Sequence, residues 1–177
     1  MPDDMQILLT KYPRDDWAAH PGFHEKTRHW MAAHRMFKQV AGSIVRNCES
    51  YLDNKMDRIA FGDTVAYRGT RLVNNLHGHH HWEDHSFFPE LSAADPRFDR
   101  GLGILEKDHI DLDAVLNGFV GSGNRALKLI QLDEIDAQSA VDDMYQHAKG
   151  ISALLERHLT DEDELAVPII LEHRLRG

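Results

Sequence analysis

The feature that most constrains the fold is the spacing of the apolar residues, which recur at alternating steps of three and four along most of the chain. This spacing is typical of amphipathic helices that bury one face, and no two-residue alternation typical of strands competes with it. We expect four helices joined by turns, at about residues 22–53, 63–91, 101–120 and 133–165. The sequence therefore predicts an all-α fold, an antiparallel up-down-up-down four-helix bundle.

The chain has 177 residues and no break in composition, so we expect one core. Residues 1–21 lack a clear helical period and are predicted to form an N-terminal arm whose apolar side chains pack on the bundle of residues 22–177. Residues 121–124, Gly-Ser-Gly-Asn, are expected to end the third helix, and Pro168 to bend or end the fourth. The predicted organisation is thus an arm followed by a single bundle.

The charge of the chain excludes some classes of partner. A formal net charge of −9 argues against a nucleic acid or an anionic membrane surface, because both require a basic face. The first residues carry acids where a secretory signal has a basic region, and no apolar run reaches 18 residues, so we expect a cytoplasmic protein. Because Cys48 is the single cysteine, any metal must be held by nitrogen and oxygen atoms.

Histidine occupies one position on the apolar stripe of each predicted helix. His34, for example, follows Trp30 by four residues and precedes Phe37 by three, a spacing that places all three on one face. The same logic predicts that one imidazole from each helix points toward the bundle axis. These residues are His34, His79, His109 and His158.

Two of these histidines are followed four residues later by a glutamate, Glu83 and Glu162, so that each pair shares a helix face. The segments 79–89 and 158–168 both run from the histidine to a proline at the same distance, which makes them an internal repeat. Buried carboxylates are costly unless cations offset their charge. Four imidazoles and two carboxylates around one point therefore predict a site for two metal ions, in an order unlike the Glu-x-x-His of ferritin-like bundles.

Other polar residues near these positions are open to more than one interpretation. His80 is a further candidate, either as an extra ligand or as a hydrogen-bond donor behind the ligands. Asp113 is either a weak or water-bridged ligand or a solvated carboxylate, and His147 is most simply a hydrogen-bonded core histidine. The acids beside the two glutamates are interpreted as solvated: Asp84, Asp161 and Asp163. A metal-free or zinc-bound structural bundle remains an alternative to a redox-metal site.

Three segments, HGHHHWEDHSFFPEL, LEKDHIDL and ERHLTDEDELAVP, resemble the signature segments of the hemerythrin HHE cation-binding family, and the resemblance covers about residues 22–170. It implies a left-handed four-helix bundle that holds two non-haem iron ions with an oxo or hydroxo bridge. It also implies that Glu83 and Glu162 bridge the irons. The four histidines named above would be the terminal ligands.

The same resemblance implies that the small ligand is oxygen, peroxide or nitric oxide. Oxygen-carrying hemerythrins have a second histidine four residues after the ligand of the third helix, and Asp113 stands there in this chain. We therefore favour redox chemistry, such as peroxide disproportionation or an oxidase reaction, or sensing over transport. The alternatives are a non-catalytic iron or oxygen sensor and a reversible oxygen-binding or storage protein.

Overall fold

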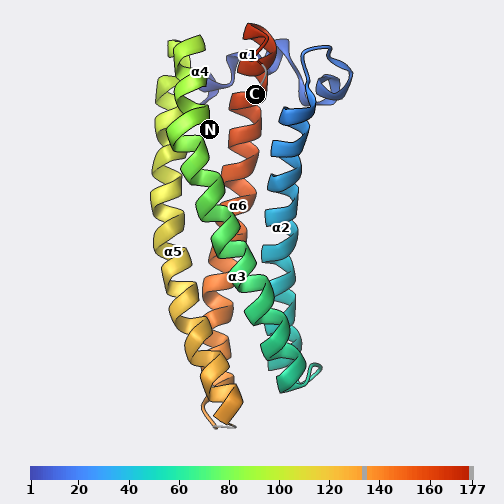
Figure 1. Cartoon of the computed structure of the whole chain (residues 1–177), viewed down its shortest axis with the longest axis vertical. Helices are drawn as coiled ribbons and strands as arrows, with labels where there is room; N and C mark the ends of the chain where they lie inside the picture. The colour runs from blue at the N-terminus through green and yellow to red at the C-terminus, as the bar shows by residue number, and fades with distance from the viewer. Residues whose placement is uncertain (133–134, 176–177) are drawn as a thin grey trace. The chain divides into compact units, whose positions relative to one another are not determined.

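The computed structural model describes residues 1–132 and 135–175, and within these ranges the chain is helical, with short connections and no strand (Figure 1). This confirms the predicted all-α class. No helix among the described residues has the length and apolarity needed to cross a membrane. The α-helices are α1 (Ile7–Lys11), α2 (Glu25–Leu52), α3 (Arg58–Trp82), α4 (Phe88–Ala94), α5 (Asp99–Leu132) and α6 (Ala137–His173).

Local hydrogen bonds explain the sharp connection between α2 and α3. Asn54 adopts a positive φ of 55°, and the Lys55 N–H donates to the Ser50 carbonyl at 2.8 Å, which satisfies a carbonyl at the end of α2. Asp57 then begins α3, because its carboxylate accepts hydrogen bonds from the backbone N–H groups of Ile59 and Ala60 at 3.0 Å. The turn therefore follows from the residues at positions 54–57.

The helices α5 and α6 extend further toward the C-terminus than the sequence predicts. Helix α5 continues through residues 121–124 to Leu132. The reason is that the buried stripe runs on through Gly123 to Ala126 and Ile130. Helix α6 likewise continues through Pro168 to His173. Residues 165–171, including Pro168, are all buried. This packing offsets the loss of the backbone hydrogen bond that proline cannot donate. The predicted start of the fourth helix at residue 133 lies outside the described residues.

The second predicted helix is not a single α-helix. It begins at Arg58, five residues before the predicted start, and a π-helical segment, Glu83–Phe87, separates α3 from α4. A π-helical turn closes i→i+5 hydrogen bonds and adds one residue to the turn, so it shifts which side chains face inward. Here it leaves both Glu83 and Phe87 buried at the end of α3.

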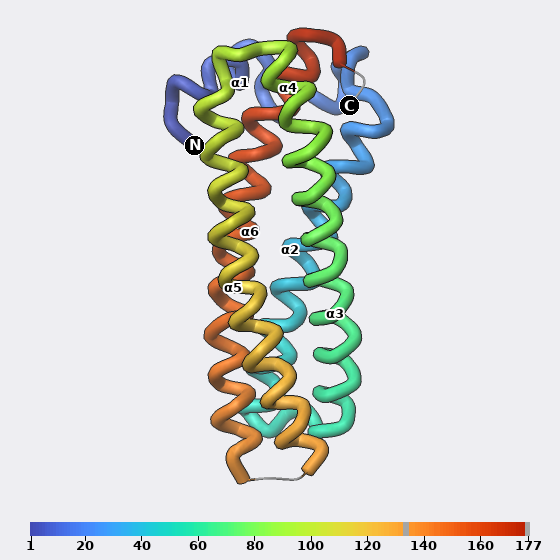
Figure 2. Tube along the Cα trace, turned by 60° about the vertical axis from the view of Figure 1, so that its left-hand side comes forward, coloured from blue at the N-terminus to red at the C-terminus, as the bar shows by residue number. Residues whose placement is uncertain are grey.

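The chain divides into two compact units, and each of the helices α2, α3, α5 and α6 contributes residues to both. Figure 2 shows the Cα trace of these helices. Unit 1 comprises Met1–Met36, Gly78–Ile110 and Glu156–Gly177, and unit 2 comprises Phe37–His77 and Asp111–Leu155. Unit 1 combines the beginnings of α2 and α5 with the ends of α3 and α6, as alternating helix directions require.

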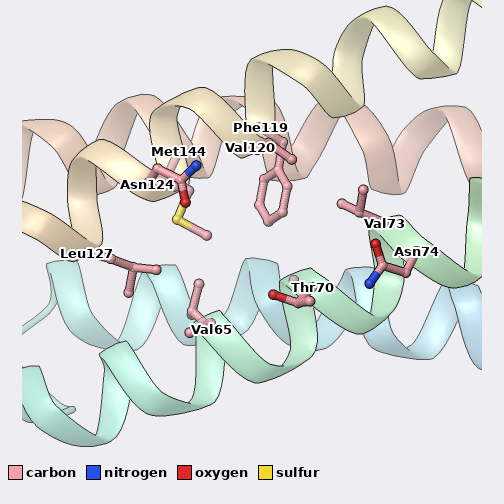
Figure 3. Close-up of a pocket in the computed structure, with 12 residues that line it drawn as sticks. Val65, Thr70, Val73, Asn74, Phe119, Val120, Asn124, Leu127 and Met144 are labelled. Carbon is pink, nitrogen blue, oxygen red and sulfur yellow. The ribbon is translucent and has the colours of Figure 1, made fainter.

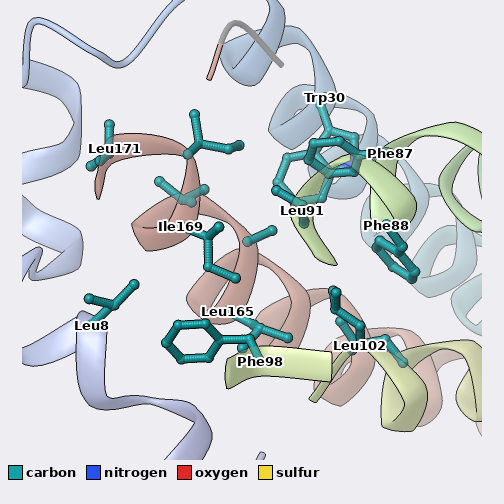
Figure 4. Close-up of a cluster of buried hydrophobic side chains, with 14 of the residues drawn as sticks. Leu8, Trp30, Phe87, Phe88, Leu91, Phe98, Leu102, Leu165, Ile169 and Leu171 are labelled. Atoms are coloured by element: carbon teal, nitrogen blue, oxygen red, sulfur yellow. The ribbon is translucent and has the colours of Figure 1, made fainter. Parts of the chain in front are cut away.

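The apolar core of unit 1 includes the N-terminal residues (Figure 4). Met5, Leu8 and Trp17 are buried there against aromatic and aliphatic side chains of the helices, whereas Ile7 is half exposed. The expected packing of apolar arm residues is thus observed, and the boundary at residue 21 stays a prediction. The helix residues of this core that Figure 4 labels are Trp30, Phe87, Phe88, Leu91, Phe98, Leu102, Leu165, Ile169 and Leu171.

Unit 2 buries aliphatic and aromatic side chains and contains a cavity of about 220 Å³ (Figure 3). Phe119 and Met144 line this cavity, together with small residues of α3 such as Gly69. The apolar spacing in the sequence predicts Val120 and Leu154 on the inward stripes. Both predictions are wrong by one residue, because Phe119 is buried in place of Val120 and Leu155 is more deeply buried than Leu154. Steps of three and of four residues both fit a helix, so the apolar pattern alone does not decide which of two neighbouring residues faces inward.

Candidate metal centre

The helices of unit 1 carry buried histidine side chains on their inward faces, whereas the inward faces of the helices in unit 2 carry apolar side chains. His34 on α2, His109 on α5 and His158 on α6 are each at most 3% exposed, and α3 contributes two neighbouring histidines, His79 and His80. Glu83 begins the π-helical segment, and Glu162 lies one turn after His158; both are fully buried. All seven residues belong to unit 1.

Four of these residues form a first group that can hold a metal ion: His34, His79, Glu83 and Glu162. One ligand atom from each lies within 4.8 Å of the others. The Nε2 atoms of His34 and His79 are 2.9 Å apart, and His79 Nε2 is 2.9 Å from Glu83 Oε1. His34 Nε2 is 3.5 Å from Glu162 Oε2. Two imidazoles and two carboxylates thus converge on a single point.

Three histidines, His80, His109 and His158, form a second group with the same property. The rings of His80 and His109 are stacked, with centroids 4.0 Å apart and an interplanar angle of 11°. The rings of His109 and His158 meet edge to face at 4.8 Å. This group is built from nitrogen atoms on α3, α5 and α6.

The two glutamates of the first group also lie beside histidines of the second group. Glu83 places Oε1 beside His79 and Oε2 3.7 Å from His109 Nε2. Glu162 Oε2 is 3.5 Å from His34 Nε2 and 3.7 Å from His158 Nε2. Each carboxylate therefore faces at least one histidine of each group, a placement that would allow it to bridge two cations.

Carboxylates behind the ligands hydrogen-bond the Nδ1 atoms of two histidines, and another carboxylate lies near the Nδ1 atom of His158. His34 Nδ1 is 2.8 Å from Asp163 Oδ1, and His109 Nδ1 is 2.7 Å from Asp84 Oδ1. His158 Nδ1 is 3.4 Å from Asp108 Oδ2. A carboxylate hydrogen-bonded to Nδ1 fixes the tautomer and leaves Nε2 to bind a metal, so His34 and His109 are oriented as ligands, whereas His158 Nδ1 forms no hydrogen bond.

Arginines complete two of these carboxylate contacts. Arg14, from the N-terminal segment, donates to Asp163 at 2.6 Å, and Arg157 donates to Asp108 at 2.8 Å from each of two nitrogens. The interpretation of Asp163 and Asp84 as solvated acids was wrong, since both pair with a buried histidine. Their spacing one residue after each glutamate is the signal that could have identified them.

Burial and mutual charge set the protonation of the two glutamates. Burial alone would raise the pKa of Glu83, but His34 and His79 outweigh it and hold that pKa well below the ordinary value. Burial, reinforced by the charge of Glu83, raises the pKa of Glu162 well above the ordinary value. One carboxylate is therefore stabilised as an anion and its neighbour as a neutral acid, as for two acids sharing a site.

The histidines divide in a similar way. Burial alone would lower the pKa of His34, but Asp163 and Glu83 raise it above the ordinary value. Burial, followed by the charge of His109, lowers the pKa of His80 to about 2. Burial and His158 also lower the pKa of His109. Neutral imidazole is the form that binds metal, so the lowered pKa values of His80 and His109 favour cation binding at neutral pH.

The hydrogen bonding of the site also fits metal ions. Buried polar groups in proteins almost always have a hydrogen-bond partner. Here both ring nitrogens of His80, the Nε2 atoms of His109 and His158, Oε2 of Glu83 and both oxygens of Glu162 are buried without one. Cations between the two groups would satisfy these atoms and offset the carboxylate charge. The donor set therefore fits two metal ions.

The structure thus brings together the six residues singled out from the sequence, with two differences. They are divided between two groups rather than arranged around one point, and His80 joins them as a full member of the second group. Asp113 belongs to neither group; it lies in unit 2, with an oxygen 3.4 Å from His77 Nδ1. His147 also lies in unit 2, against Gly118.

Trp30 is a contact of the site that the sequence pattern did not reveal. It was expected only as an apolar core residue, but its indole Nε1–H donates to Glu83 Oε1 at 2.6 Å. Its ring also meets His34 edge to face at 4.3 Å. A tryptophan on an apolar stripe carries no separate sequence signal for such a hydrogen bond.

An all-α chain with a buried cluster of histidines and glutamates, each oriented by neighbouring helices, defines a helical metal-binding protein. Comparison with known families specifies the class further: the sequence profile of the hemerythrin HHE cation binding domain matches residues 25–170. The chain therefore belongs to the hemerythrin HHE cation-binding family. Neither a curated protein nor a solved structure matches it. The matched range contains every residue of both groups.

Proposed function

We propose that this protein is a non-haem di-iron protein that binds or reacts with oxygen, peroxide or nitric oxide at a carboxylate-bridged iron pair. The first group, His34, His79 and the two glutamates, would hold one ion. The second group, His80, His109 and His158, would hold the other and share Glu83 and Glu162. The observation that carries the proposal is the placement of both glutamates between the two groups.

The donor atoms limit the choice of metal. The two groups offer imidazole nitrogen and carboxylate oxygen without sulfur, which suits iron, manganese or zinc. The family profile supports a cation, and a bridging carboxylate pair is compatible with two ions of variable oxidation state. When bound, an oxo- or hydroxo-bridged iron pair supplies the redox chemistry that the side chains themselves lack.

The chain's own residues prepare this site. Asp163 and Asp84 hydrogen-bond His34 and His109 at Nδ1 and so direct the Nε2 atoms of these two histidines inward. Trp30 donates to Glu83 and fixes the plane of that carboxylate. The apolar side chains around the site exclude bulk water, which strengthens every electrostatic interaction between ligands and ions.

Reversible oxygen binding is a second candidate, and His80 favours it. The missing second histidine at position 113 argued against an oxygen carrier, but His80 brings the number of histidines in the two groups to five. The two functions differ in outcome: a carrier releases oxygen unchanged, whereas a redox protein consumes oxygen or peroxide. A non-catalytic iron or oxygen sensor would consume neither oxygen nor peroxide, and its stability would change when it binds iron or oxygen.

The test is to load the metal-free protein with ferrous iron under anaerobic conditions. We expect two irons per chain, a visible absorption change on exposure to oxygen or peroxide, and consumption of peroxide. Glu83→Ala should bind at most one iron and lose peroxide consumption, whereas Glu90→Ala, an exposed position in the same unit, should behave as the parent. Unchanged stoichiometry and rates in Glu83→Ala would overturn the proposal.

A further inference from the structure

Two of the three tryptophans form a ring contact path that begins at the candidate metal centre. Trp30 is 8% exposed and touches two proposed ligands, through its hydrogen bond to Glu83 and its ring contact with His34. The Trp30 ring meets the Phe87 ring at a centroid distance of 5.1 Å. The Phe87 ring is in turn stacked on Trp82 at 5.1 Å, with an interplanar angle of 12°.

The far end of this path reaches solvent. Trp82 is 42% exposed, although it directly precedes the fully buried Glu83. The π-helical segment explains the contact, since residues five apart lie above one another in a π-helical turn, and Trp82 and Phe87 are five apart. In a regular α-helix the same two side chains would point in different directions. The stack therefore depends on the local change of helix type.

A cavity of about 260 Å³ lies beside the same rings. Trp30, Trp82 and Phe87 line it, and Lys26 and His29 also contribute to its wall. A small reductant in this cavity would contact both tryptophans without reaching the interior of the metal centre. The positive charge of Lys26 suits an anionic reductant.

We propose that Trp30, Phe87 and Trp82 form a one-electron route between Glu83 at the metal centre and the protein surface. Indole is the most readily oxidised of the aromatic side chains in this path, so Trp30 and Trp82 carry the charge and Phe87 provides the contact between them. Electron transfer weakens steeply with distance, and ring-to-ring contact keeps each step short. The route rests on the proposed iron site, which supplies the oxidised end.

The electron balance is simple when hydrogen peroxide is the oxidant. Its reduction to two waters takes two electrons and two protons, which corresponds to two passes along the route. In each pass an electron leaves Trp30 for the centre, and an electron from Trp82 then restores Trp30. The oxidised Trp82 loses its indole proton to water. Ascorbate, an anionic one-electron donor, returns one electron and one proton to Trp82.

The experiment locates oxidation on individual tryptophans by peptide mass spectrometry. Iron-loaded protein is treated with hydrogen peroxide without reductant, and metal-free protein is the reference. We expect oxidation of Trp82 to be several-fold higher in the iron-loaded protein and to fall when ascorbate is added. Trp17 is the internal control, because it is 2% exposed, donates to the Tyr12 carbonyl and lies outside the path. It should stay unmodified throughout.

Two variants interrupt the route at different points. Trp30→Phe should lower the oxidation of Trp82 to the metal-free level although Trp82 remains exposed. Phe87→Leu leaves the Trp30 hydrogen bond to Glu83 intact, and it should lower oxidation of Trp82 while raising oxidation of Trp30. Freeze-quenched samples of the parent should also show a tryptophan radical by electron paramagnetic resonance, and Trp30→Phe should not.

Equal oxidation of Trp82 in the parent and in both variants would overturn the route. Iron content and peroxide consumption are measured on the same samples, so the two proposals can fail separately. Absence of iron or of peroxide consumption in the parent refutes the di-iron function and the route together. Iron binding and peroxide consumption with Trp82 unmodified refute the route alone.

Discussion

Units 1 and 2 use segments of the same four long helices but bury different chemistry. Among the described residues, all ten buried polar or charged side chains lie in unit 1. The buried side chains of unit 2 are apolar, with residues such as Phe37, Ile44 and Leu116 at 2% exposure or less. Unit 2 can therefore be stable through hydrophobic burial, whereas the interior of unit 1 requires cations or shared protons.

One helical stripe can therefore supply both an apolar core and a set of candidate metal ligands. In α6 the inward stripe runs through Met144, Ile151 and Leu155 in unit 2 and continues, in step, through His158 and Glu162 in unit 1. The backbone geometry is the same, and only the side chains change. We infer that unit 2 maintains the helices when unit 1 holds no metal.

The largest effect should come from removing the metal. With free iron at about 1,000 times its dissociation constant, binding to the folded state alone stabilises the protein by about 4 kcal/mol. Hydrogen exchange should show that a chelator accelerates exchange of amides in unit 1 far more than in unit 2. Glu162→Gln should lose most of the iron-dependent stabilisation. Equal acceleration of exchange in both units would contradict the inference that unit 2 stays folded without metal.

The metal-free form of Glu162→Gln sharpens the same point. Glu162 is fully buried and its pKa is raised, so its carboxyl group costs stability when no cation is near. The metal-free variant should therefore be at least as stable as the metal-free parent in urea. A variant clearly less stable than the parent would show that this carboxyl group supports the fold rather than the metal.

Next in size is the loss of a large side chain from unit 2. Leu116 is fully buried, and Leu116→Ala should lower the free energy of unfolding by about 3 kcal/mol through lost burial and the cavity left behind. Iron stoichiometry should stay as in the parent, because the ligands lie in unit 1. The measurement is urea unfolding combined with iron analysis, and loss of iron in folded Leu116→Ala would contradict the independence of the two interiors.

The residues that could be predicted from the sequence also differ between units 1 and 2. In unit 2, apolar periodicity identified buried residues such as Ile44 and Leu116, but it could not decide between Val120 and Phe119, because steps of three and four are equally helical. The ends of α5 and α6 were missed because glycine and proline are weak local signals that tertiary packing overrides.

In unit 1, the repeated spacing from histidine to glutamate predicted residues that the structure brings together. The role of His80 could not be predicted, because His79 and His80 lie about 100° apart on a helix and a single inward point accepts only one of them. Two adjacent groups remove that conflict. The carboxylates Asp163 and Asp84 were missed because their partners lie on other helices, at sequence separations of 129 and 25 residues.

A smaller effect is expected from two glycines two residues apart in the part of α5 that belongs to unit 1. A Cβ atom on Gly101 would meet Leu165 Cδ2 at 2.9 Å, whereas one on Gly103 would meet no atom within 4 Å. Gly101→Ala should thus destabilise by about 1–3 kcal/mol through overpacking. Gly103→Ala should stabilise by about 0.5–1 kcal/mol, because alanine favours the helix. Thermal unfolding of both variants measures this, and effects of the same sign would contradict the packing described.

The smallest effect concerns Cys48, the buried thiol of unit 2. Burial raises the pKa of Cys48 from 9.0 to about 12, so the folded protein keeps the thiol protonated where the unfolded chain would ionise it. The folded state then binds more protons than the unfolded state between these two values, and stability must fall slightly as the pH rises above 9. Below pH 9 the effect vanishes. Cys48→Ala should remove this pH dependence in urea unfolding.

Alkylation of the same thiol measures how closed unit 2 remains without metal. Only the thiolate reacts, and an exposed cysteine would react faster as the pH rises toward 9. Cys48 is fully buried, so in native protein its alkylation should stay slow from pH 7 to pH 9 and become fast only in urea. If unit 2 alone maintains the helices, chelating the metal of unit 1 leaves this rate unchanged. Rapid alkylation after chelation would mean that opening of the metal site spreads through the shared helices to the apolar core.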